Sequence, residues 1–506
     1  MLRIPFFRFG AECPGLGLIS GPLIFDTGEA DRSFLYRCQD RFFSYNALSG
    51  LRSVVLVTGW SHCQRYRALW MRQRNLFERL ADRTRLAVPS IEDPLYVPLD
   101  WDTLTVEPQP WFHDQDLPSS GGIALNQVSP TAAKIVQGLN LLLPGGLMNI
   151  GELHRMAAIG ALALQYHDKA EQFELCRGAS GLPPHAETAV LSRHELLELK
   201  DWDAVRARFP GRPLDEAYLK SSYDSGGNFA ARISKACHKE QLQDMQRRAR
   251  YEAEADAADE TDCASLAADL SLSLSFVCPE PGIQIPELLR KQKTRRGRTR
   301  FLLQKALSPP VRGAGSRCIG ICCEASTGPL FASGQIYRDA VRKHFLGAYL
   351  NSAFSASVLD SSLTEQMKAL CSLFAAKGYR GPIGFDACAG PDGSWTLVYD
   401  CNPRLSAVYP ALAVERFLWS QNLECRHLIS LGYRGEWNRQ SFEEWLDLFE
   451  SKSLLYGAGR DRGILMLPNM SRPQGCDLLL VNVAPEESAD FLNRAGLSGA
   501  AFQLVW

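Results

Sequence analysis

The sequence lacks several features that would assign it to a class of protein at once. Its 15 cysteines include no CxxC pair, which removes the usual spacing of a structural zinc site. Charge of neither sign dominates, because the formal net charge is −1, so nothing in the charge balance points to nucleic acid or an anionic membrane. The longest apolar run, residues 156–164, is far too short to span a bilayer.

Signals for targeting and for common enzyme classes are also missing. Arg8 and Glu12 interrupt the apolar opening of the chain before the core of a signal peptide forms. The Gly-rich stretches match neither a Walker A loop nor a dinucleotide-binding fingerprint, and no GxSxG elbow predicts a hydrolase. We therefore expect a cytoplasmic protein whose cysteines are reduced and packed as small apolar residues.

The composition that is present fits an ordinary globular protein of several domains. The chain has 506 residues, of which 46% are apolar and 22% charged, so it can bury a core without disulfides. Residues 53–59 predict a buried strand, 64–83 an amphipathic helix and 85–91 a second strand. This order predicts a small α/β domain with a parallel sheet within residues 1–150, in which residues 92–128 form a long loop.

The rest of the chain alternates helical and strand patterns. An acidic stretch at 252–262 predicts a solvated loop. The C-terminal patterns predict a small structural element at the end of the fold. The expected helices are 151–175, 238–250, 362–377 and 440–450, and the expected strands are two within 214–234 and one each at 300–307, 317–325, 381–389, 395–403, 463–468 and 477–485.

A basic segment, residues 290–300, holds seven positive charges. Three interpretations stay open for it: a solvated loop, a clamp for phosphates or an acidic substrate, and a nucleic-acid contact. The last has no interleaved aromatic residues to support it.

The most informative constellation is the expected hairpin at residues 381–404. Asp386 lies in its first strand, and Asp400, Asn402 and Arg404 lie at the end of its second strand. Residues separated by two share one face of a strand. Carboxylate and amide oxygens are the hard ligands that Mg²⁺ prefers, and an arginine can hold a phosphate or a carboxylate through two parallel hydrogen bonds. A polar outer face of an exposed hairpin is the structural alternative.

A second feature is Lys220, which ends an expected strand. Ser225, Gly226 and Gly227 follow it in a Gly-rich loop. Glycines let backbone amides approach phosphate oxygens closely, and the lysine adds positive charge. Most Gly-rich loops are only turns, so this loop alone does not establish a phosphate site.

Taken in this order, these residues resemble the ATP-grasp superfamily. In that family a lysine follows an aspartate at the head of a helix, as Lys169 follows Asp168 here, and a second lysine precedes a phosphate loop, as Lys220 does. Gln304 resembles the hinge residue that faces adenine, and the hairpin resembles the metal and phosphate site. The resemblance covers residues 165–415.

The resemblance implies an α/β and α+β chain with an ATP-grasp fold. It implies a pre-ATP-grasp α/β domain at 1–150, an ATP-grasp domain at 151–435 with a lid subdomain at 215–305, and a small C-terminal α/β element at 436–506. The implied cofactors are ATP and Mg²⁺. ATP would be bound by Lys169, Lys220, Ser225, Gly226, Gly227 and Gln304, Mg²⁺ would be held by Asp386, Asp400 and Asn402, and the catalytic residues would be Arg404 and Lys220.

The implied activity is that of an ADP-forming ligase, which activates a carboxylate as an acyl phosphate and joins it to an amine. Small carboxylates and amines, with amino acids or a peptide favoured, are the expected partners. The family usually has Glu at both metal positions, whereas this chain has Asp386 and Asp400, so a weakened or inactive site stays open. A bicarbonate or thiol acceptor, a regulatory or scaffold protein with a decayed site, and a homodimer also stay open, whereas nucleic-acid and membrane partners are not expected.

Overall fold

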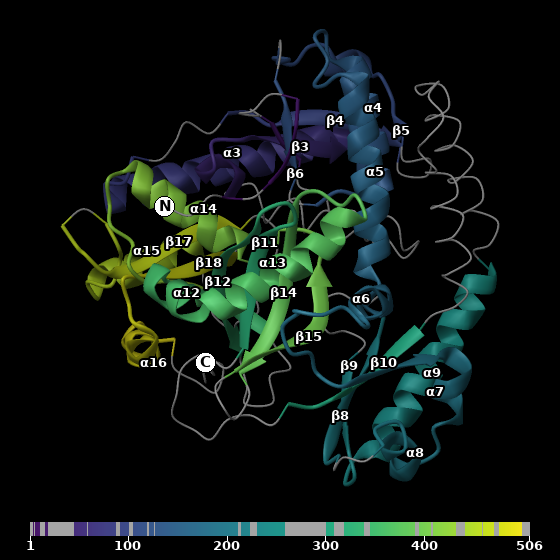
Figure 1. Cartoon of the computed structure of the whole chain (residues 1–506). Coiled ribbons are helices and arrows are strands. Elements are labelled where there is room, and N and C mark those ends of the chain that lie inside the picture. The colour runs from purple at the N-terminus through teal and green to yellow at the C-terminus, as the bar shows by residue number, and fades with distance from the viewer. Residues whose placement is uncertain are drawn as a thin grey trace.

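The part of the chain that the structure describes forms three sheets with helices packed against them (Figure 1). The structure is a computed structural model. The sheets combine parallel and antiparallel pairing, which confirms the expected mixture of α/β and α+β architecture. The described residues are 4, 6–10, 16–18, 45–57, 59–87, 92–100, 105–118, 121–125, 127–210, 214–222, 230–258, 300–307, 318–337, 345–389, 394–405, 408–431, 441–457, 459–469 and 475–497.

The N-terminal part of the chain builds a six-stranded sheet in the order β1-β6-β2-β3-β4-β5. Strands β6, β2, β3 and β4 run parallel. The apolar run expected as a strand at 53–59 forms β3, and Val54, Val55, Leu56 and Val57 are buried there. The strands are β1 (Phe7–Phe9), β2 (Leu16–Leu18), β3 (Arg52–Val57), β4 (Leu95–Asp100), β5 (Thr105–Val106) and β6 (Ile123–Leu125), and the helices are α3 (Trp60–Thr84), the short η1 (Pro110–Phe112), α4 (Pro130–Leu142) and α5 (Ile150–His167).

The strand expected at 85–91 is not formed over residues 85–87, and residues 88–91 lie outside the described part of the chain. Helix α3 ends where Arg85 adopts a left-handed conformation with φ 56°, and the next described residues form no strand. Leu86 is buried in the core, so burial without strand pairing accounts for this apolar position. The next strand is β4, inside the segment 92–128 that we expected as a loop, and its Pro98 is a residue that normally argues against a strand interior.

The helix expected at 151–175 is divided into α5 and α6 (Lys169–Cys176). Asp168 ends α5 in an extended conformation, and its carboxylate accepts a 2.9 Å hydrogen bond from the amide of Ala170. An aspartate in this position satisfies one of the unpaired amides at a helix start. The division therefore places Lys169 in the first turn of α6.

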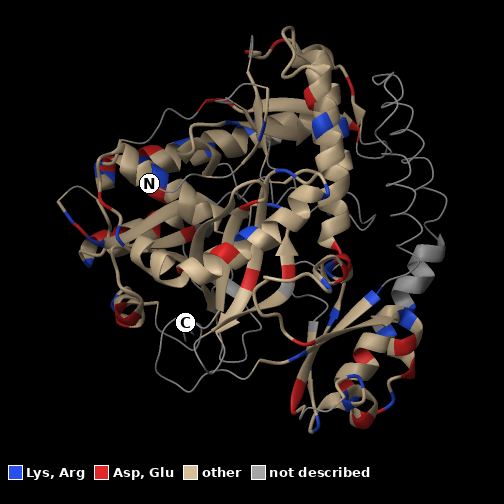
Figure 2. Cartoon of the chain, in the orientation of Figure 1, with Lys and Arg blue, Asp and Glu red and all other residues tan. Residues whose placement is uncertain are grey.

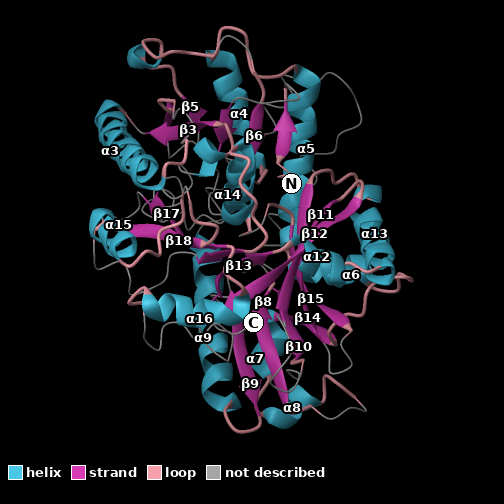
Figure 3. Ribbon diagram, turned by 90° about the vertical axis from the view of Figure 1, so that its left-hand side faces the viewer, coloured by secondary structure: helices cyan, strands magenta, loops and turns pink. Residues whose placement is uncertain are grey.

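The second sheet has four antiparallel strands in the order β7-β10-β8-β9 and lies at the opposite end of the molecule from the first sheet (Figure 3). The range 215–305 expected for a lid leaves out β7, which pairs with β10. Helix α9 continues through 252–258, so the loop expected there is wrong for those residues. The elements are β7 (Thr188–Ser192), α7 (Arg193–Glu198), α8 (Trp202–Arg206), β8 (Glu216–Ser221), β9 (Ala230–Ser234), α9 (His238–Ala258) and β10 (Arg300–Lys305).

The third sheet has eight antiparallel strands in the order β15-β14-β11-β12-β13-β16-β18-β17. Some of its buried side chains, among them Ile319, Ile321 and Phe385, belong to the same hydrophobic cluster as those of the first sheet, whereas the four-stranded sheet has a cluster of its own. The elements are β11 (Cys318–Glu324), β12 (Gly328–Tyr337), β13 (Phe345–Leu350), α12 (Ser352–Val358), α13 (Ser361–Ala376), β14 (Pro382–Ala389), β15 (Trp395–Asn402), α14 (Tyr409–Ser420), β16 (Leu428–Leu431), α15 (Phe442–Ser451), β17 (Gly463–Asn469), β18 (Gly475–Val481) and α16 (Pro485–Arg494).

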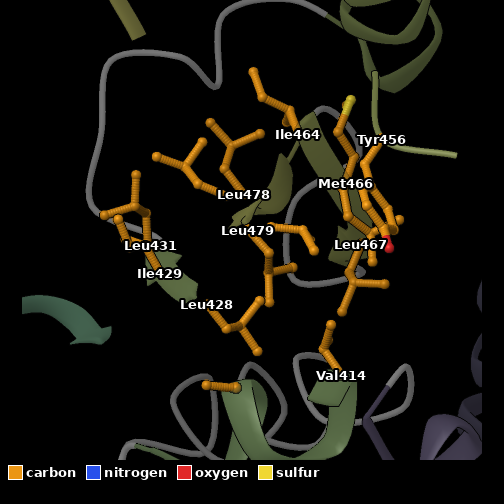
Figure 4. Close-up of a cluster of buried hydrophobic side chains, with 14 of the residues drawn as sticks. Val414, Leu428, Ile429, Leu431, Tyr456, Ile464, Met466, Leu467, Leu478 and Leu479 are labelled. Atoms are coloured by element: carbon orange, nitrogen blue, oxygen red, sulfur yellow. The ribbon is translucent and has the colours of Figure 1, made fainter. Parts of the chain in front are cut away.

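The C-terminal strands extend this large sheet at the edge opposite β15. β18 pairs with both β16 and β17, and their leucine and isoleucine side chains pack with residues of α14 (Figure 4). The strands expected at 463–468 and 477–485 therefore form the last two strands at this end of the sheet, and they bury apolar side chains. Over the described residues, no helix is long and apolar enough to cross a membrane.

Candidate active site

The expected hairpin is formed by β14 and β15, and it places two carboxylates close together. Phe385 pairs with Cys401, and both side chains are buried in the core. Because side chains alternate along a strand, Asp386 and Asp400 lie on the opposite face. The pairing register shifts directly after this pair, so that Ala387 is opposite Leu397. The extra residues form a bulge at the acids, a feature that re-aims side chains beside functional sites.

The surroundings of Asp386 act strongly on the pKa of its carboxyl group. Burial, followed by the negative charge of Asp400, raises the pKa of Asp386 to about 8. Gln335 on β12 opposes this shift, because its amide nitrogen donates a 2.7 Å hydrogen bond to Asp386 Oδ1. Two acids in this relation favour a cation between them.

Gln335 was not among the expected site residues, and it reaches Asp386 across the intervening strand β11. Gly320 of β11 is paired with Asp386 on one side and with Ser333 on the other. A Cβ atom at Gly320 would lie 3.6 Å from Gln335 Nε2 and 3.8 Å from Asp386 Oδ1. Since glycine has no side chain, the two groups can meet over it. A sequence pattern could reveal this contact only after the strand order is known.

Lys169 brings a positive charge to the second acid. Its Nζ lies 3.6 Å from Asp400 Oδ1, and its side chain is only 6% exposed. The amide of Lys169 donates a 2.9 Å hydrogen bond to the carbonyl of Ser222, just after β8. The start of α6 is therefore attached to the end of the strand that carries Lys220.

Lys220 and Gln304 meet on the four-stranded sheet. Lys220 Nζ donates to Gln304 Oε1 at 3.0 Å, and Gln304 Nε2 donates to Thr188 Oγ1 at 3.1 Å. Gln304 is 2% exposed. Burial lowers the pKa of Lys220, while the charge of Asp400 raises it. Ser222, two residues after Lys220, is hydrogen-bonded to Lys169, which contacts Asp400, so the second lysine lies close to the hairpin.

Arg300 is a second residue at the site that was not expected from the sequence. Its Nη2 donates to Asp168 Oδ2 at 2.6 Å and to Glu171 Oε1 at 2.7 Å. This arginine on β10 therefore fastens the four-stranded sheet to the start of α6. In the sequence it is the last residue of the basic segment 290–300, whose other residues lie outside the described part of the chain.

The remaining expected site residues divide into two groups. Ser225, Gly226 and Gly227 lie outside the described residues. Arg404 and Asn402 are in contact, because Arg404 Nη2 donates to Asn402 Oδ1 at 3.1 Å.

We expected Arg404 to lie at the end of the second strand, but it lies outside that strand. β15 ends at Asn402, and the amide of Arg404 donates a 2.7 Å hydrogen bond back to the Asn402 carbonyl. Pro403, which lacks an amide hydrogen, cannot continue the strand pairing. The tight turn after Asn402 still keeps Arg404 next to the hairpin.

These oxygen donors fit Mg²⁺ only in combination with other ligands. Among the described residues, no group of three or more His, Cys, Asp and Glu side chains could hold a metal ion. Asp386 and Asp400 offer hard carboxylate oxygens, and Asn402 adds an amide oxygen. Mg²⁺ usually takes one or two protein carboxylates and fills its remaining positions with water and substrate phosphates, which agrees with this small donor set.

Charges of both signs are interspersed over the helices around the four-stranded sheet (Figure 2).

The site combines Lys169, Lys220 and Arg404 with two acids. It is therefore suited to an anionic ligand that brings its own cation.

No family model matches this sequence, and neither does any curated protein. Among solved structures, the fold is similar to N5-carboxyaminoimidazole synthetase from Staphylococcus aureus complexed with ADP, with a TM-score of 0.42, 10% identity, and coverage of 97% of this chain and 98% of that one. It is also similar to N5-carboxyaminoimidazole ribonucleotide synthetase from Thermus thermophilus, with a TM-score of 0.42, 12% identity, and coverage of 97% and 99%.

A third similar structure is the biotin carboxylase domain of 2-oxoglutarate carboxylase from Hydrogenobacter thermophilus, in complex with MgADP, ADP and bicarbonate. Its TM-score is 0.40 at 12% identity, over 96% of this chain and 90% of that one. Similarity of this size assigns no activity, and the function proposed below is supported by the contacts of this chain's own residues.

Proposed function

We propose that the protein is an ATP-grasp ligase that uses ATP and Mg²⁺ to activate a carboxylate and join it to an amine, with release of ADP and phosphate. The observation that carries this proposal is the 3.6 Å contact between Lys169 and Asp400. It joins the lysine at the head of α6 to the acid of the hairpin. The charges of Lys220 and Asp386 each act on the pKa of the other group, and the charge of Asp400 acts on the pKa of both.

The lysines are the proposed phosphate ligands. Lys169 and Lys220 are held by Asp400 and Gln304 in the structure, and ATP phosphates would offer both ammonium groups stronger anionic partners. The two strands that carry Lys220 and Gln304 are neighbours. We therefore assign the adenine-facing position to Gln304 and the phosphate position to Lys220.

Asp386, Asp400 and Asn402 are the proposed Mg²⁺ ligands. When bound there, Mg²⁺ would neutralise the phosphate charge and hold ATP against the hairpin. Arg404, two residues beyond Asn402, would then hold the transferring phosphoryl group through its planar guanidinium. Binding in this way would also remove the repulsion between the two acids, which raises the pKa of Asp386 in the structure.

The proposed reaction has two steps. A substrate carboxylate attacks the γ-phosphorus of ATP, which forms an acyl phosphate and releases ADP. An amine then attacks the acyl carbon, phosphate leaves with its electron pair, and the amine loses a proton. In both steps the side chains position reactants and stabilise negative charge, without a covalent bond to the protein.

A protein that binds nucleotide without turnover is the second candidate. One observation favours it: aspartate stands at both metal positions. Aspartate is one methylene shorter than glutamate, so the cation must sit closer to the strands. Bicarbonate or a thiol in place of the amine would leave the same site chemistry intact.

The test is a screen for ADP release from ATP and Mg²⁺ with pooled amino acids and small carboxylates, with and without added amines. With the amino acids, which carry both groups, we expect ADP and phosphate without any addition, and with the small carboxylates only after an amine is added. Release of AMP and pyrophosphate would contradict the proposal, because it indicates an acyl adenylate. Tight nucleotide binding without release of any product would favour the second candidate.

A further inference from the structure

Two thiols face each other beside the candidate active site. Cys318 on β11 is paired directly with Cys388 on β14, and their Sγ atoms are 3.2 Å apart. Directly opposed residues of antiparallel strands have Cα atoms about 4.5–5.5 Å apart, which lies within the range of about 4.4–6.8 Å found across disulfides. Bringing the sulfurs to bonding distance therefore needs only a small movement.

The pair shares a face of the sheet with Asp386. Gly320 is opposite Asp386, and Cys318, two residues before Gly320, is opposite Cys388, two residues after Asp386. Because side chains alternate, both thiols lie on the carboxylate side, whereas Ile319 points into the core. Cys388 follows Asp386 by two residues on β14, so the pair stands next to a proposed metal ligand.

The two cysteines differ in accessibility. Cys388 is half-buried, and Cys318 is 5% exposed. This combination suits a two-step oxidation, in which one cysteine meets the oxidant and a covered neighbour resolves the intermediate.

We propose that Cys318 and Cys388 form a redox modification site, which a low-molecular-weight disulfide such as glutathione disulfide converts into an intramolecular cross-strand disulfide. Cys388, as the thiolate, attacks one sulfur of glutathione disulfide, forms a mixed disulfide and releases one glutathione thiolate. Cys318, as the thiolate, then attacks Cys388 Sγ and releases the second. The protein dithiol loses two electrons and two protons, and glutathione disulfide gains them as two glutathione molecules.

A buried pair provides an internal control. Cys323 and Cys371 also interact through their side chains, but they are 0% and 1% exposed. If proximity alone decided the outcome, both pairs would oxidise. The proposal instead requires access, and predicts that only Cys318 and Cys388 become linked in the folded protein.

The experiment is disulfide mapping of the full chain after incubation with glutathione disulfide, with remaining thiols alkylated under denaturing conditions. We expect a peptide linking Cys318 to Cys388, which disappears after treatment with dithiothreitol, while Cys323 and Cys371 stay alkylated. The exposed Cys237 reports that the oxidant is active. Absence of the linked peptide while Cys237 carries glutathione, or equal oxidation of the buried pair, would overturn the proposal.

Two variants define the order of attack. Cys318→Ser removes the resolving thiol, so glutathione should stay attached at Cys388. Cys388→Ser removes the accessible thiol, so Cys318 should stay unmodified. The reverse pattern would contradict the assignment. The mapping of the parent protein uses no variant, so it decides the proposal even where a variant fails to fold.

A consequence for ligand binding rests on the proposed function. Closure of the disulfide shifts β14 at a position two residues from Asp386, and small displacements at such sites have large effects. We expect the oxidised protein to bind MgADP about tenfold more weakly than the reduced protein, and bound MgADP to slow the oxidation in return. Equal affinity of the two forms would contradict this coupling. Failure of the reduced protein to bind MgADP would instead contradict the proposed function, and the mapped disulfide would be unaffected.

Discussion

The two sides of the candidate site are built differently. Asp386 and Asp400 project from the eight-stranded sheet, whose core continues into the first sheet. Lys220 and Gln304 project from the four-stranded sheet, which has a separate core. One side is anchored in the main body of the protein, and the other is a small unit with its own packing.

The contacts between the two sides are polar. Arg300 of the four-stranded sheet reaches Asp168 at the start of α6, and the segment before β7 exchanges backbone hydrogen bonds with Leu397 of β15. Polar contacts can exchange one partner for another, whereas a shared hydrophobic core resists opening. This difference indicates that the two acids keep their positions in the large sheet. The four-stranded sheet is the part that can move when a ligand binds.

The largest effect is expected from Asp400→Asn, which changes one of the two acids of the eight-stranded sheet. The variant keeps the shape of the side chain and removes the charge that the cation and Lys169 both contact. We expect turnover of ATP to fall by at least about 10²-fold, as for the loss of a contact to developing charge.

The melting temperature without ligand should change little in this variant, because the lost attraction to Lys169 is offset by relief of repulsion with Asp386. Steady-state ADP release and thermal unfolding measure the two quantities. Glu424→Gln is the matched control, since Glu424 is an exposed acid paired with Arg426. Parent-like turnover in both variants would remove Asp400 from the site.

The second effect concerns the attachment between the two sides. Arg300→Met removes the cation that contacts Asp168, whose side chain is 2% exposed. Removing one partner of a buried pair costs about 3–5 kcal/mol. Because Arg300 is partly exposed, we expect a smaller loss of about 2 kcal/mol in the free energy of unfolding. Urea titration measures it, and Arg206→Gln, which removes an exposed ion pair with Asp203, should change the same quantity very little.

A third, smaller effect tests how Asp386 is positioned. Gln335→Leu removes the hydrogen bond to Asp386 Oδ1 while keeping a side chain of similar size. Partners that orient metal ligands contribute about 10–100-fold to metal affinity, and we expect the lower end of this range for Mg²⁺. Mn²⁺ binding followed by electron paramagnetic resonance in the presence of ADP gives a readout independent of turnover. Gln64→Leu, an exposed position on α3, is the control, and equal Mn²⁺ affinity in all three proteins would show that Gln335 does not position the acid.

The smallest effect is a change of dynamics without loss of function. When a non-hydrolysable ATP analogue and Mg²⁺ bind, amide hydrogen exchange should slow in β8 and β9 more than in β14. The reason is that the four-stranded sheet gains a ligand across its polar boundary, whereas the large sheet is already held by its core. Uniform protection of both sheets would break the distinction between a fixed and an adjustable side.

The sequence was most informative where the chemistry is local. The acids and Asn402 of the hairpin occur within one short segment, and the structure brings Asp386, Asp400 and Lys220 to one site as the motif order suggests. β3, β14 and β15 were predictable because their apolar and polar residues alternate or run together as strands require. The glycine loop with Ser225, Gly226 and Gly227 lies outside the described residues, so its role stays a prediction.

What the sequence could not supply depends on contacts between distant strands. Gln335 meets Asp386 only because β11 lies between their strands and has Gly320 at the crossing point. Arg300 looked like one more charge in a basic run, and its acidic partners come from the start of α6. β4 was missed because Pro98 lies within it. Gln335 and Arg300 were therefore missed because their partners lie far away in the chain, whereas β4 was missed because of a residue within the strand itself.

The most direct test of the central claim follows an oxygen atom from the carboxylate. In the proposed reaction a carboxylate oxygen attacks phosphorus and later leaves with the phosphate. A pool of amino acids with ¹⁸O in their carboxyl groups, incubated with the protein, ATP, Mg²⁺ and amines, should therefore yield inorganic phosphate that carries ¹⁸O, together with ADP. Label in AMP instead, or unlabelled phosphate formed while an amide product accumulates, would contradict an acyl phosphate and with it the ATP-grasp mechanism proposed for this protein.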